Sequence, residues 1–298
     1  MVKMLKLGII GMNEGNGHPY SWSAICNGYD PEYMQDCPFP TIPQYLSEKK
    51  FPDDAIKCAK VTHIWTQDRT ISQHIARSAN IAHIVDKKEE MIGKVDAILL
   101  ARDDYENHLI NSEIFIEAGL PIYIDKPLAI HRKKAEEILL KEKEKGQIFS
   151  CSALKYATEY NLAKDRLKRV GKIKSIHAVV MKSWEKYAIH VIDPILRLIG
   201  YHHLIQSSTV TKSDGAVHVN YLTQDDVLIN ITVVEEAIYL PFRITLIGTD
   251  DYMELEMKDT FLAFKSSLEK FIGIVTRKEA PLSHEEMLKT VEFIEAGI

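Results

Sequence analysis

Short apolar runs alternate with segments of helical spacing through the first 125 residues. Runs of this length and composition are typical of strands that are buried on both faces of a sheet. The predicted strands span residues 5–10, 60–66, 82–85, 95–101 and 121–125, and the predicted helices span residues 20–27, 71–78 and 108–118. Strands that alternate with helices in this way predict an α/β fold with a Rossmann-like, doubly wound parallel sheet.

One segment interrupts this alternation. Residues 30–52 contain five prolines, so we expect an irregular insertion there. After residue 125 the pattern changes to a charged helix over 130–145, followed by longer runs in which apolar and polar residues alternate with period two. Such alternation predicts an antiparallel or mixed sheet.

Two more helices are expected in the second half, at 193–199 and from Ser283, where Glu286 completes the spacing of a capping box. We therefore predict a Rossmann-like nucleotide-binding domain over 1–125. An α+β domain with an open, mainly antiparallel sheet would follow over 126–298.

Composition excludes several classes of protein. The chain has 37 basic and 42 acidic residues and a formal net charge of -5, which gives no electrostatic reason to expect a nucleic-acid partner. No apolar run approaches the roughly 20 residues that a membrane helix needs. The four cysteines, Cys26, Cys37, Cys58 and Cys151, form no CxxC pair, so we expect reduced thiols in a cytoplasmic protein.

Three stretches carry candidate chemistry. The first is the glycine-rich "GMNEGNGHP" at 11–19, between a predicted strand and a predicted helix, where nucleotide-binding folds place a phosphate. The second, "YIDKPLA" at 123–129, puts Lys126 at the carboxyl edge of the sheet, where open α/β sheets bind ligands. The third is "SWEKYAIHVIDPILRLIG" at 183–200, in which His190 and Asp193 share a helix face.

Taken in order along the chain, the glycine turn, "VDAILLA" followed by His108, "DKPLA", "GKIKSIHA", "YAIHVID" and "ITLIGTDDYMELE" resemble the Gfo/Idh/MocA family of oxidoreductases. The resemblance implies a Rossmann domain followed by an α+β domain. It also implies a hydride transfer between NAD(P) and a hydroxyl or carbonyl group of a sugar or sugar-derived substrate. The sheet of the second domain often forms the oligomer interface in this family, which implies a homodimer or homotetramer.

The resemblance assigns roles to particular residues. Lys126 matches the family's active-site lysine and His190 its proton-transferring histidine, with Lys126 also near cofactor and substrate. An imidazole suits proton transfer near neutral pH, and an ammonium stabilises a developing alkoxide. Asp193 either orients His190 or caps its helix, and Tyr187 is a further candidate substrate residue.

The sequence also departs from the family pattern. Lys186 stands where an Asp is common, and Asp103-Asp104-Tyr105 replaces Thr-Pro-Asn. A GxGxxG motif aligned on Gly11 would need glycines where Asn13 and Asn16 stand, so Gly15 and Gly17 are expected to supply backbone freedom in a shifted register.

The expected cofactor site therefore comprises Gly11, Asn13, Gly15, Asn16, Gly17, Asp68, Asp103 and Lys126. Asp68 follows the second predicted strand, and a carboxylate there favours NAD over NADP. Asp103 is expected to bind ribose or sugar hydroxyls, or else to lie in a solvated loop. His202 and His203 have no second pair of ligands at metal spacing, so no metal site is predicted. The alternative function is a protein of the same scaffold that binds a sugar-like ligand without hydride transfer.

Overall fold

The computed structural model describes residues 4–161 and 164–298. The chain forms two compact units, and each is described by itself. The first comprises the residues up to Leu128 together with Glu137–Ser150 and Phe264–Leu282, and the second comprises Ala129–Glu136, Cys151–Ala263 and Ser283–Ile298. Among the described residues, no helix combines the length and the apolar character needed to cross a membrane.

The first unit is built on a six-stranded sheet with the order β3-β2-β1-β4-β5-β6, in which every neighbouring pair is parallel. Its strands are β1 (Leu5–Ile10), β2 (Ala59–Trp65), β3 (His83–Ile84), β4 (Ala97–Leu100), β5 (Ile122–Ile124) and β6 (Ile148–Phe149). The Rossmann-like prediction is confirmed. The strand order reverses between β1 and β4, and ligands of open α/β sheets bind at such a switch point.

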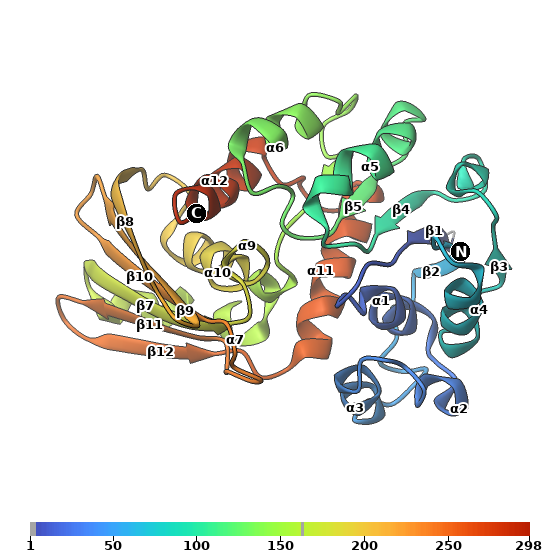
Figure 1. Ribbon diagram of the computed structural model, residues 1–298, viewed down its shortest axis with the longest axis horizontal. Coiled ribbons are helices and arrows are strands. Elements are labelled where there is room, and N and C mark those ends of the chain that lie inside the picture. The colour runs from blue at the N-terminus through green and yellow to red at the C-terminus, as the bar shows by residue number, and fades with distance from the viewer. Residues whose placement is uncertain (1–3, 162–163) are drawn as a thin grey trace. The chain divides into compact units, whose positions relative to one another are not determined.

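The helices of this unit are α1 (His18–Asn27), α2 (Pro31–Met34), α3 (Thr41–Ser47), α4 (Arg69–Ser78), η1 (Lys88–Met91), η2 (Tyr105–Asn107) and α5 (His108–Glu117). The expectation of an irregular insertion over 30–52 is wrong in part, because α2 and α3 lie within it, near α1 (Figure 1). Asp30 caps α2 by accepting a hydrogen bond from the Glu32 N–H, and Pro31 occupies the first turn, where a missing N–H costs nothing.

The units do not divide at a single point after residue 125. Strand β6 joins the first unit because it pairs in parallel with β5, where Ile122 lies opposite Ile148. Most of α11 (Thr260–Val275) joins it as well, since Phe271 packs against the rings of Tyr123 and Phe149, with both pairs of ring centroids 5.7 Å apart. The apolar faces of late segments thus complete the core of the early domain.

The second unit contains a mixed sheet with the order β12-β11-β7-β10-β9-β8. Its strands are β7 (Ile173–Met181), β8 (Ile205–Ser213), β9 (Ala216–Thr223), β10 (Leu228–Val234), β11 (Arg243–Gly248) and β12 (Tyr252–Glu256). Only the pair β7–β10 is parallel, which confirms the mainly antiparallel sheet. In β10, Ile229, Ile231 and Val233 are buried, and the residues between them face outward.

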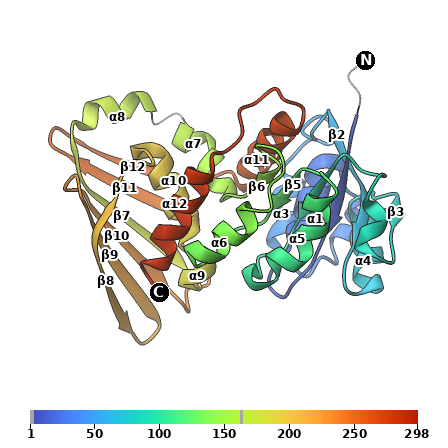
Figure 2. The ribbon, with the colours of Figure 1, turned by 90° about the horizontal axis from the view of Figure 1, so that it is seen from above.

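Helices α10 (Ile189–Ile199) and α12 (His284–Glu295) lie on one face of this sheet (Figure 2). The remaining helices of the unit are η3 (Ala153–Tyr156), α7 (Thr158–Asn161), α8 (Lys164–Val170) and α9 (Trp184–Tyr187). The capping box at the start of α12 is confirmed, since the Ser283 hydroxyl accepts from the Glu286 N–H and the Glu286 carboxylate accepts from the Ser283 N–H.

Two predicted helices differ from the structure. The helix expected over 130–145 is shorter, because α6 (Arg132–Leu139) ends six residues early and gives way to turns before Gly146. Gly146 has a φ of +88°, and a Cβ there would lie 2.6 Å from Pro281 Cγ, so a close packing contact requires this glycine. Helix α10 begins four residues earlier than predicted, which places His190 in its first turn.

Candidate active site

The turn between β1 and α1 requires its glycines for two different reasons. A Cβ on Gly11 would lie 2.4 Å from Pro19 Cγ, and one on Gly17 would lie 2.6 Å from Ile42 and 2.7 Å from Phe39. These two positions therefore need glycine for packing. Gly15 has a φ of +78°, so the backbone conformation of the turn favours glycine at this position. No atom lies within 4 Å of the place that a Cβ of Gly15 would occupy, so the space beside this residue is open.

The two asparagines that replace expected glycines direct their side chains to the edge of the sheet. The Asn13 amide donates to Asp103 Oδ1 at 2.7 Å and accepts from the Asp103 N–H at 3.0 Å. The Asn16 amide donates to Asp125 Oδ2 at 2.8 Å. Because both amides are bonded to residues that follow β4 and β5, they close the turn onto the sheet edge.

Two residues that the sequence analysis missed hold the same turn from its other side. The Met12 N–H donates to Gln67 Oε1 at 3.1 Å, and the Gln67 amide donates to the Met12 carbonyl. Arg102 donates to the same carbonyl at 3.3 Å while it forms a two-pronged ion pair with Asp104. Neither residue belongs to a motif, so only their contacts identify them.

Lys126 is buried at the carboxyl end of β5, with 4% of its surface exposed. Its Nζ lies 3.6 Å from Asp103 Oδ2, and Asp103 is buried as well. The structure therefore joins three predicted site residues, Asn13, Asp103 and Lys126, into one polar cluster. A buried ammonium beside a carboxylate is typical of a functional site rather than of a solvated lysine.

Asp125, next to Lys126, is the most enclosed member of this site. Its carboxylate accepts from His18 Nδ1 at 2.5 Å, from Asn16 Nδ2 at 2.8 Å and from the Lys126 N–H at 2.8 Å. Burial raises the pKa of Asp125, but His18 and Lys126 outweigh burial, so the pKa lies below its usual range. The sequence showed the Asp-Lys-Pro motif but gave no sign that His18 was its partner.

Asp68 does not join this cluster in the described part of the chain. It is exposed and serves as the N-cap of α4, where its carboxylate accepts from the Thr70 N–H at 2.7 Å. This leaves the predicted ribose contact of Asp68 as a hypothesis that rests on its place after β2.

A dinucleotide would need backbone donors at this turn. In the described part of the chain, the N–H groups of Asn13, Glu14 and Gly15 have no hydrogen-bond partner, and successive N–H groups of this kind form a concavity for anions. The first turn of α1 offers less, because the His18 N–H is bonded to Asn16 Oδ1 and Pro19 has no N–H. The residues present thus fit a pyrophosphate at the turn rather than at the helix end.

In the second unit, His190 is buried in the first turn of α10. Its Nδ1 lies 2.9 Å from Ser152 Oγ, and its ring meets those of Tyr187 and Phe242 edge-on, with 5.3 Å between centroids in each case. Lys182 donates a hydrogen bond to the Tyr187 hydroxyl at 2.5 Å and lies over its ring. These contacts hold the imidazole in one orientation.

Asp193 forms an ion pair with a lysine that the sequence analysis did not single out. Lys155 Nζ lies 3.1 Å from Asp193 Oδ1, and both groups are buried. The Ser152 N–H donates to Asp193 Oδ2 at 2.8 Å, and the Ser152 hydroxyl bonds His190. Ser152 thus links Asp193 to His190, and Lys155 is the residue that the sequence analysis missed.

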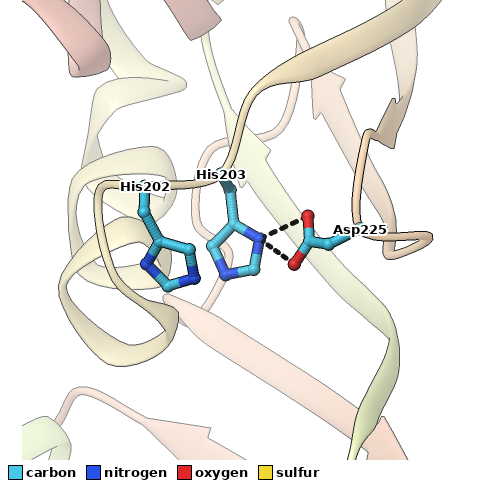
Figure 3. A group of neighbouring side chains, drawn as sticks. All are labelled: His202, His203 and Asp225. Carbon is cyan, nitrogen blue, oxygen red and sulfur yellow. Dashed lines mark hydrogen bonds and ion pairs between the residues drawn. The ribbon is translucent and has the colours of Figure 1, made fainter.

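A group of possible metal ligands lies at the end of α10. The side chains of His202, His203 and Asp225 bring their ligand atoms within 4.8 Å of one another, and Asp225 comes from the β9–β10 turn (Figure 3). His203 Nδ1 lies 2.8 Å from Asp225 Oδ1, and Nε2 lies 3.2 Å from the Ile199 carbonyl. Since both ring nitrogens already face oxygen acceptors, we interpret His203 as a structural link between α10 and this turn.

A depression of about 380 Å³ in the first unit is lined by Pro121, Gln147, Ile274 and Pro281. Pro121 and Gln147 precede β5 and β6, so this depression lies at the amino ends of the strands. Lys126 and Asp103 follow the carboxyl ends, where the polar cluster lies. We place the candidate site at the cluster, because ligands of such sheets bind at the carboxyl edge.

Comparisons with known proteins agree with this architecture. The model of an oxidoreductase family with an NAD-binding Rossmann fold, GFO_IDH_MocA, matches residues 43–152. No curated protein sequence matches the chain. Among solved structures, myo-inositol dehydrogenase from Lactobacillus casei in complex with NAD(H) and myo-inositol is similar over 99% of this chain and 93% of its own, with a TM-score of 0.75 and 15% identity.

Two further structures show the same similarity. Myo-inositol 2-dehydrogenase from Lactobacillus plantarum matches over 98% of this chain and 96% of its own, with a TM-score of 0.75 and 13% identity. Scyllo-inositol dehydrogenase from Lactobacillus casei with bound NAD(H) and scyllo-inositol matches over 99% and 96%, with a TM-score of 0.72 and 13% identity. The resemblance to the Gfo/Idh/MocA oxidoreductases is therefore confirmed by the family model over residues 43–152, and the solved structures show that nearly the whole chain shares their fold.

Proposed function

We propose that the protein transfers a hydride between a nicotinamide cofactor and a hydroxyl or carbonyl group of a sugar or sugar-derived polyol. The observation that carries this proposal is the buried Lys126 ammonium at the carboxyl end of β5, in a chain whose nucleotide-binding part matches an NAD-binding oxidoreductase family. The inositol bound in two of the similar structures supports a polyol as the substrate class.

The cofactor would supply the acceptor for the hydride. The turn residues Asn13, Glu14 and Gly15 would hold the pyrophosphate through their N–H groups. Asp68, an exposed carboxylate after β2, would repel a 2′-phosphate, so we propose NAD rather than NADP. Asp103 would hold a ribose or substrate hydroxyl beside Lys126.

The chain's own residues would handle the substrate. Lys126 would bind the reacting oxygen and stabilise negative charge on it, because an ammonium fixed in a buried place needs no reorganisation during the reaction. His190 would exchange a proton with a substrate hydroxyl, since its ring is already oriented by Ser152. Tyr187 would lie against the substrate, and Asp193 would act through Ser152.

A rival proposal is that the protein binds a sugar-like ligand without hydride transfer. It is favoured by Lys186, which stands where the family commonly has an acid, and by the altered glycine turn. The cheapest discriminating experiment is a titration of the purified protein with NADH and NADPH, followed by absorbance at the nicotinamide band with a panel of inositols and sugars. Binding of NADH with polyol-dependent turnover supports the dehydrogenase, and polyol binding without nicotinamide binding supports the rival.

Variants then test the two proposed catalytic residues. His190→Ala should lower turnover by about 10²–10⁴-fold, the usual contribution of general acid–base catalysis, and leave NADH affinity nearly unchanged. Lys126→Ala should lower turnover and also weaken substrate binding, because an ammonium contacts the oxygen before and during the reaction. Turnover of His190→Ala within about threefold of wild type would contradict its assignment.

We further propose a cytoplasmic location and a homodimer or homotetramer with no nucleic-acid or membrane partner. The four cysteines all lie in the described part of the chain and form no disulfide with one another, which is the usual state in a reducing compartment.

A further inference from the structure

The pair formed by the partly exposed His18 and the buried Asp125 takes no part in the proposed chemistry and calls for a separate explanation. His18 Nδ1 lies 2.5 Å from Asp125 Oδ2, and only 1% of the Asp125 surface is exposed. A buried carboxylate is costly unless its oxygens are hydrogen-bonded. The pair also stands directly beside Lys126, the residue that the proposed reaction depends on.

The His18 ring is held firmly on its own helix. It stacks on Trp22 with 5.0 Å between ring centroids and 12° between planes, and Trp22 stacks in turn on Tyr123 of β5 at 4.7 Å. Phe264 of α11 meets the His18 ring edge-on at 5.0 Å. This aromatic stack leaves the imidazole little freedom, so its Nδ1 is presented to Asp125 from a fixed place.

Asp125 passes this constraint to the next residue. One carboxylate oxygen, Oδ2, takes the two hydrogen bonds from His18 and Asn16, and the other, Oδ1, accepts from the backbone N–H of Lys126. The Lys126 peptide is therefore tied to α1 through one carboxylate. At the other end of the lysine, Lys126 Nζ lies 3.6 Å from Asp103 Oδ2, and the Asn13 amide donates a hydrogen bond to the other oxygen of Asp103.

We infer that His18 is a positioning residue for Lys126: through the Asp125 carboxylate it fixes the peptide that carries the ammonium, and so the place where the substrate oxygen would bind. This inference rests on the proposed function and deepens it. A misplacement of about 1 Å can cost roughly a hundredfold in rate, so a tie of this kind is of use to a catalytic lysine. The charged groups that interact with Asp125 are His18, Lys126 and Asp103.

The first experiment uses the protein without cofactor or substrate. The rate at which the Lys126 amine is acetylated by limiting acetic anhydride is measured by mass spectrometry in wild type, His18→Ala and His18→Asn. An Asn amide can donate to Asp125 from nearly the place of Nδ1, so it preserves the tie but has no imidazole. His74→Ala is the matched control, because His74 also bonds α1, at the Tyr20 hydroxyl, and has no contact with Asp125 among the described residues.

We expect His18→Ala to accelerate acetylation of Lys126 by about tenfold to a hundredfold, the equivalent of losing a hydrogen bond to a charged group. His18→Asn and His74→Ala should stay within about threefold of wild type, well inside that range. If His18→Ala does not fold, His18→Phe replaces it, since a phenyl ring can keep the stack on Trp22 but has no N–H to donate to Asp125. Equal acetylation rates in wild type and in the folded variant that breaks the tie would overturn the inference, whether or not the protein is a dehydrogenase.

The second experiment measures turnover on a polyol that wild type oxidises. His18→Ala should lower kcat by about a hundredfold with a smaller change in KM, and His18→Asn should recover most of it. Turnover that falls equally in both variants would contradict positioning and would point to the imidazole itself. An absence of nicotinamide-dependent turnover in wild type would instead refute the proposed function, and the acetylation rates would still decide whether His18 holds Lys126.

Discussion

Buried charges in both units come in matched pairs, Lys126 with Asp103 in the first and Lys155 with Asp193 in the second. Each pair is nearly inaccessible to water, so each charge depends on its partner and on neighbouring hydrogen bonds. Such pairs are costly to break because the remaining charge stays buried. Single substitutions at these positions should therefore have large effects on stability.

Lys155→Met should lower the free energy of unfolding by about 3–5 kcal/mol, because it leaves Asp193 buried without its cation. Lys174→Met is the control, since Lys174 and Asp226 form an exposed pair whose loss should cost about 0–1 kcal/mol. Urea unfolding at neutral pH measures both. A loss at Lys155 no larger than at Lys174 would show that the buried pair contributes little.

The same pair has a predictable pH dependence. Burial lowers the pKa of Lys155, but Asp193 outweighs burial and raises the pKa well above its usual range. The stabilisation by this pair is therefore complete below about pH 10.4, the usual value for lysine, and is lost as the pH rises through the raised pKa. The difference in unfolding free energy between wild type and Lys155→Met should shrink only in strongly alkaline solution.

Asp125 should show the opposite dependence. Its pKa is lowered because His18 and Lys126 outweigh burial, so its contribution is present above about pH 3.9 and is lost as the pH falls through the lowered pKa. Asp125→Asn should cost about 1.5–3 kcal/mol near neutral pH, the usual value of hydrogen bonds to a charged group. Unfolding free energies measured from pH 7 to pH 2.5 should show this difference vanish only in acid.

At the scale of elements, the turn between β1 and α1 acts as one structure with its neighbours. Residues from three strand ends hold it: Gln67 after β2, Arg102 and Asp103 after β4, and Asp125 after β5. The short helix α3 packs against the turn as well, since a side chain on Gly17 would clash with Phe39 and Ile42. Substitutions at Gly11 or Gly17 would therefore disturb packing before they reported on a cofactor.

Gln67→Ala is a cleaner test of the turn. It removes both hydrogen bonds to Met12 and leaves the glycines and the sheet untouched. We expect NADH affinity to fall by about tenfold, because ordering one more backbone residue on binding costs roughly 1–2 kcal/mol. NADH affinity is measured by a fluorescence titration. Gln44→Ala, on the exposed side of α3, serves as the control in that titration. Unchanged affinity in Gln67→Ala would mean that the cofactor does not use this turn.

At the scale of the whole molecule, the prediction of a homo-oligomer depends on the outward face of the second sheet. This face is mixed rather than wholly apolar: exposed Val179, Leu228, Ile247 and Tyr252 are interspersed with polar residues such as Asn230 and Thr232. Subunit interfaces commonly combine apolar and polar residues, so this face is compatible with contact between copies of the chain. We therefore expect a dimer or tetramer, as the sequence predicts.

Val179→Lys should shift the protein toward monomer, because Val179 lies on the central strand β7 of that face. Light scattering at micromolar concentration gives the mass directly. Ile110→Lys is the control, since Ile110 is also apolar and is more exposed than Val179 but lies on α5 of the other unit. A wild-type protein that is already monomeric under these conditions would refute the predicted oligomer.

The sequence by itself determined the alternation of most strands and helices in the first unit, the presence of two kinds of sheet and the Asp-Lys-Pro motif. These features follow from local periodicity, turn residues and the spacing of a few polar side chains. Such signals depend only on residues that are close in sequence, so they can be recognised without the fold. It also determined that Lys126 follows a strand, since the carboxyl end of β5 can be read from its apolar run. The capping box at Ser283 is local in the same sense.

Only the tertiary structure decided which groups face each other across long distances in the chain. His18 and Asp125 are 107 residues apart, Asn13 and Asp103 are 90 apart, and β6 and α11 complete the first unit from beyond its expected boundary. No local pattern marks such partners, because a buried charge can be neutralised by any suitable group that the packing brings to it. The tertiary structure pairs Lys155 with Asp193 and His18 with Asp125. These pairings determine the charge and the orientation of each side chain.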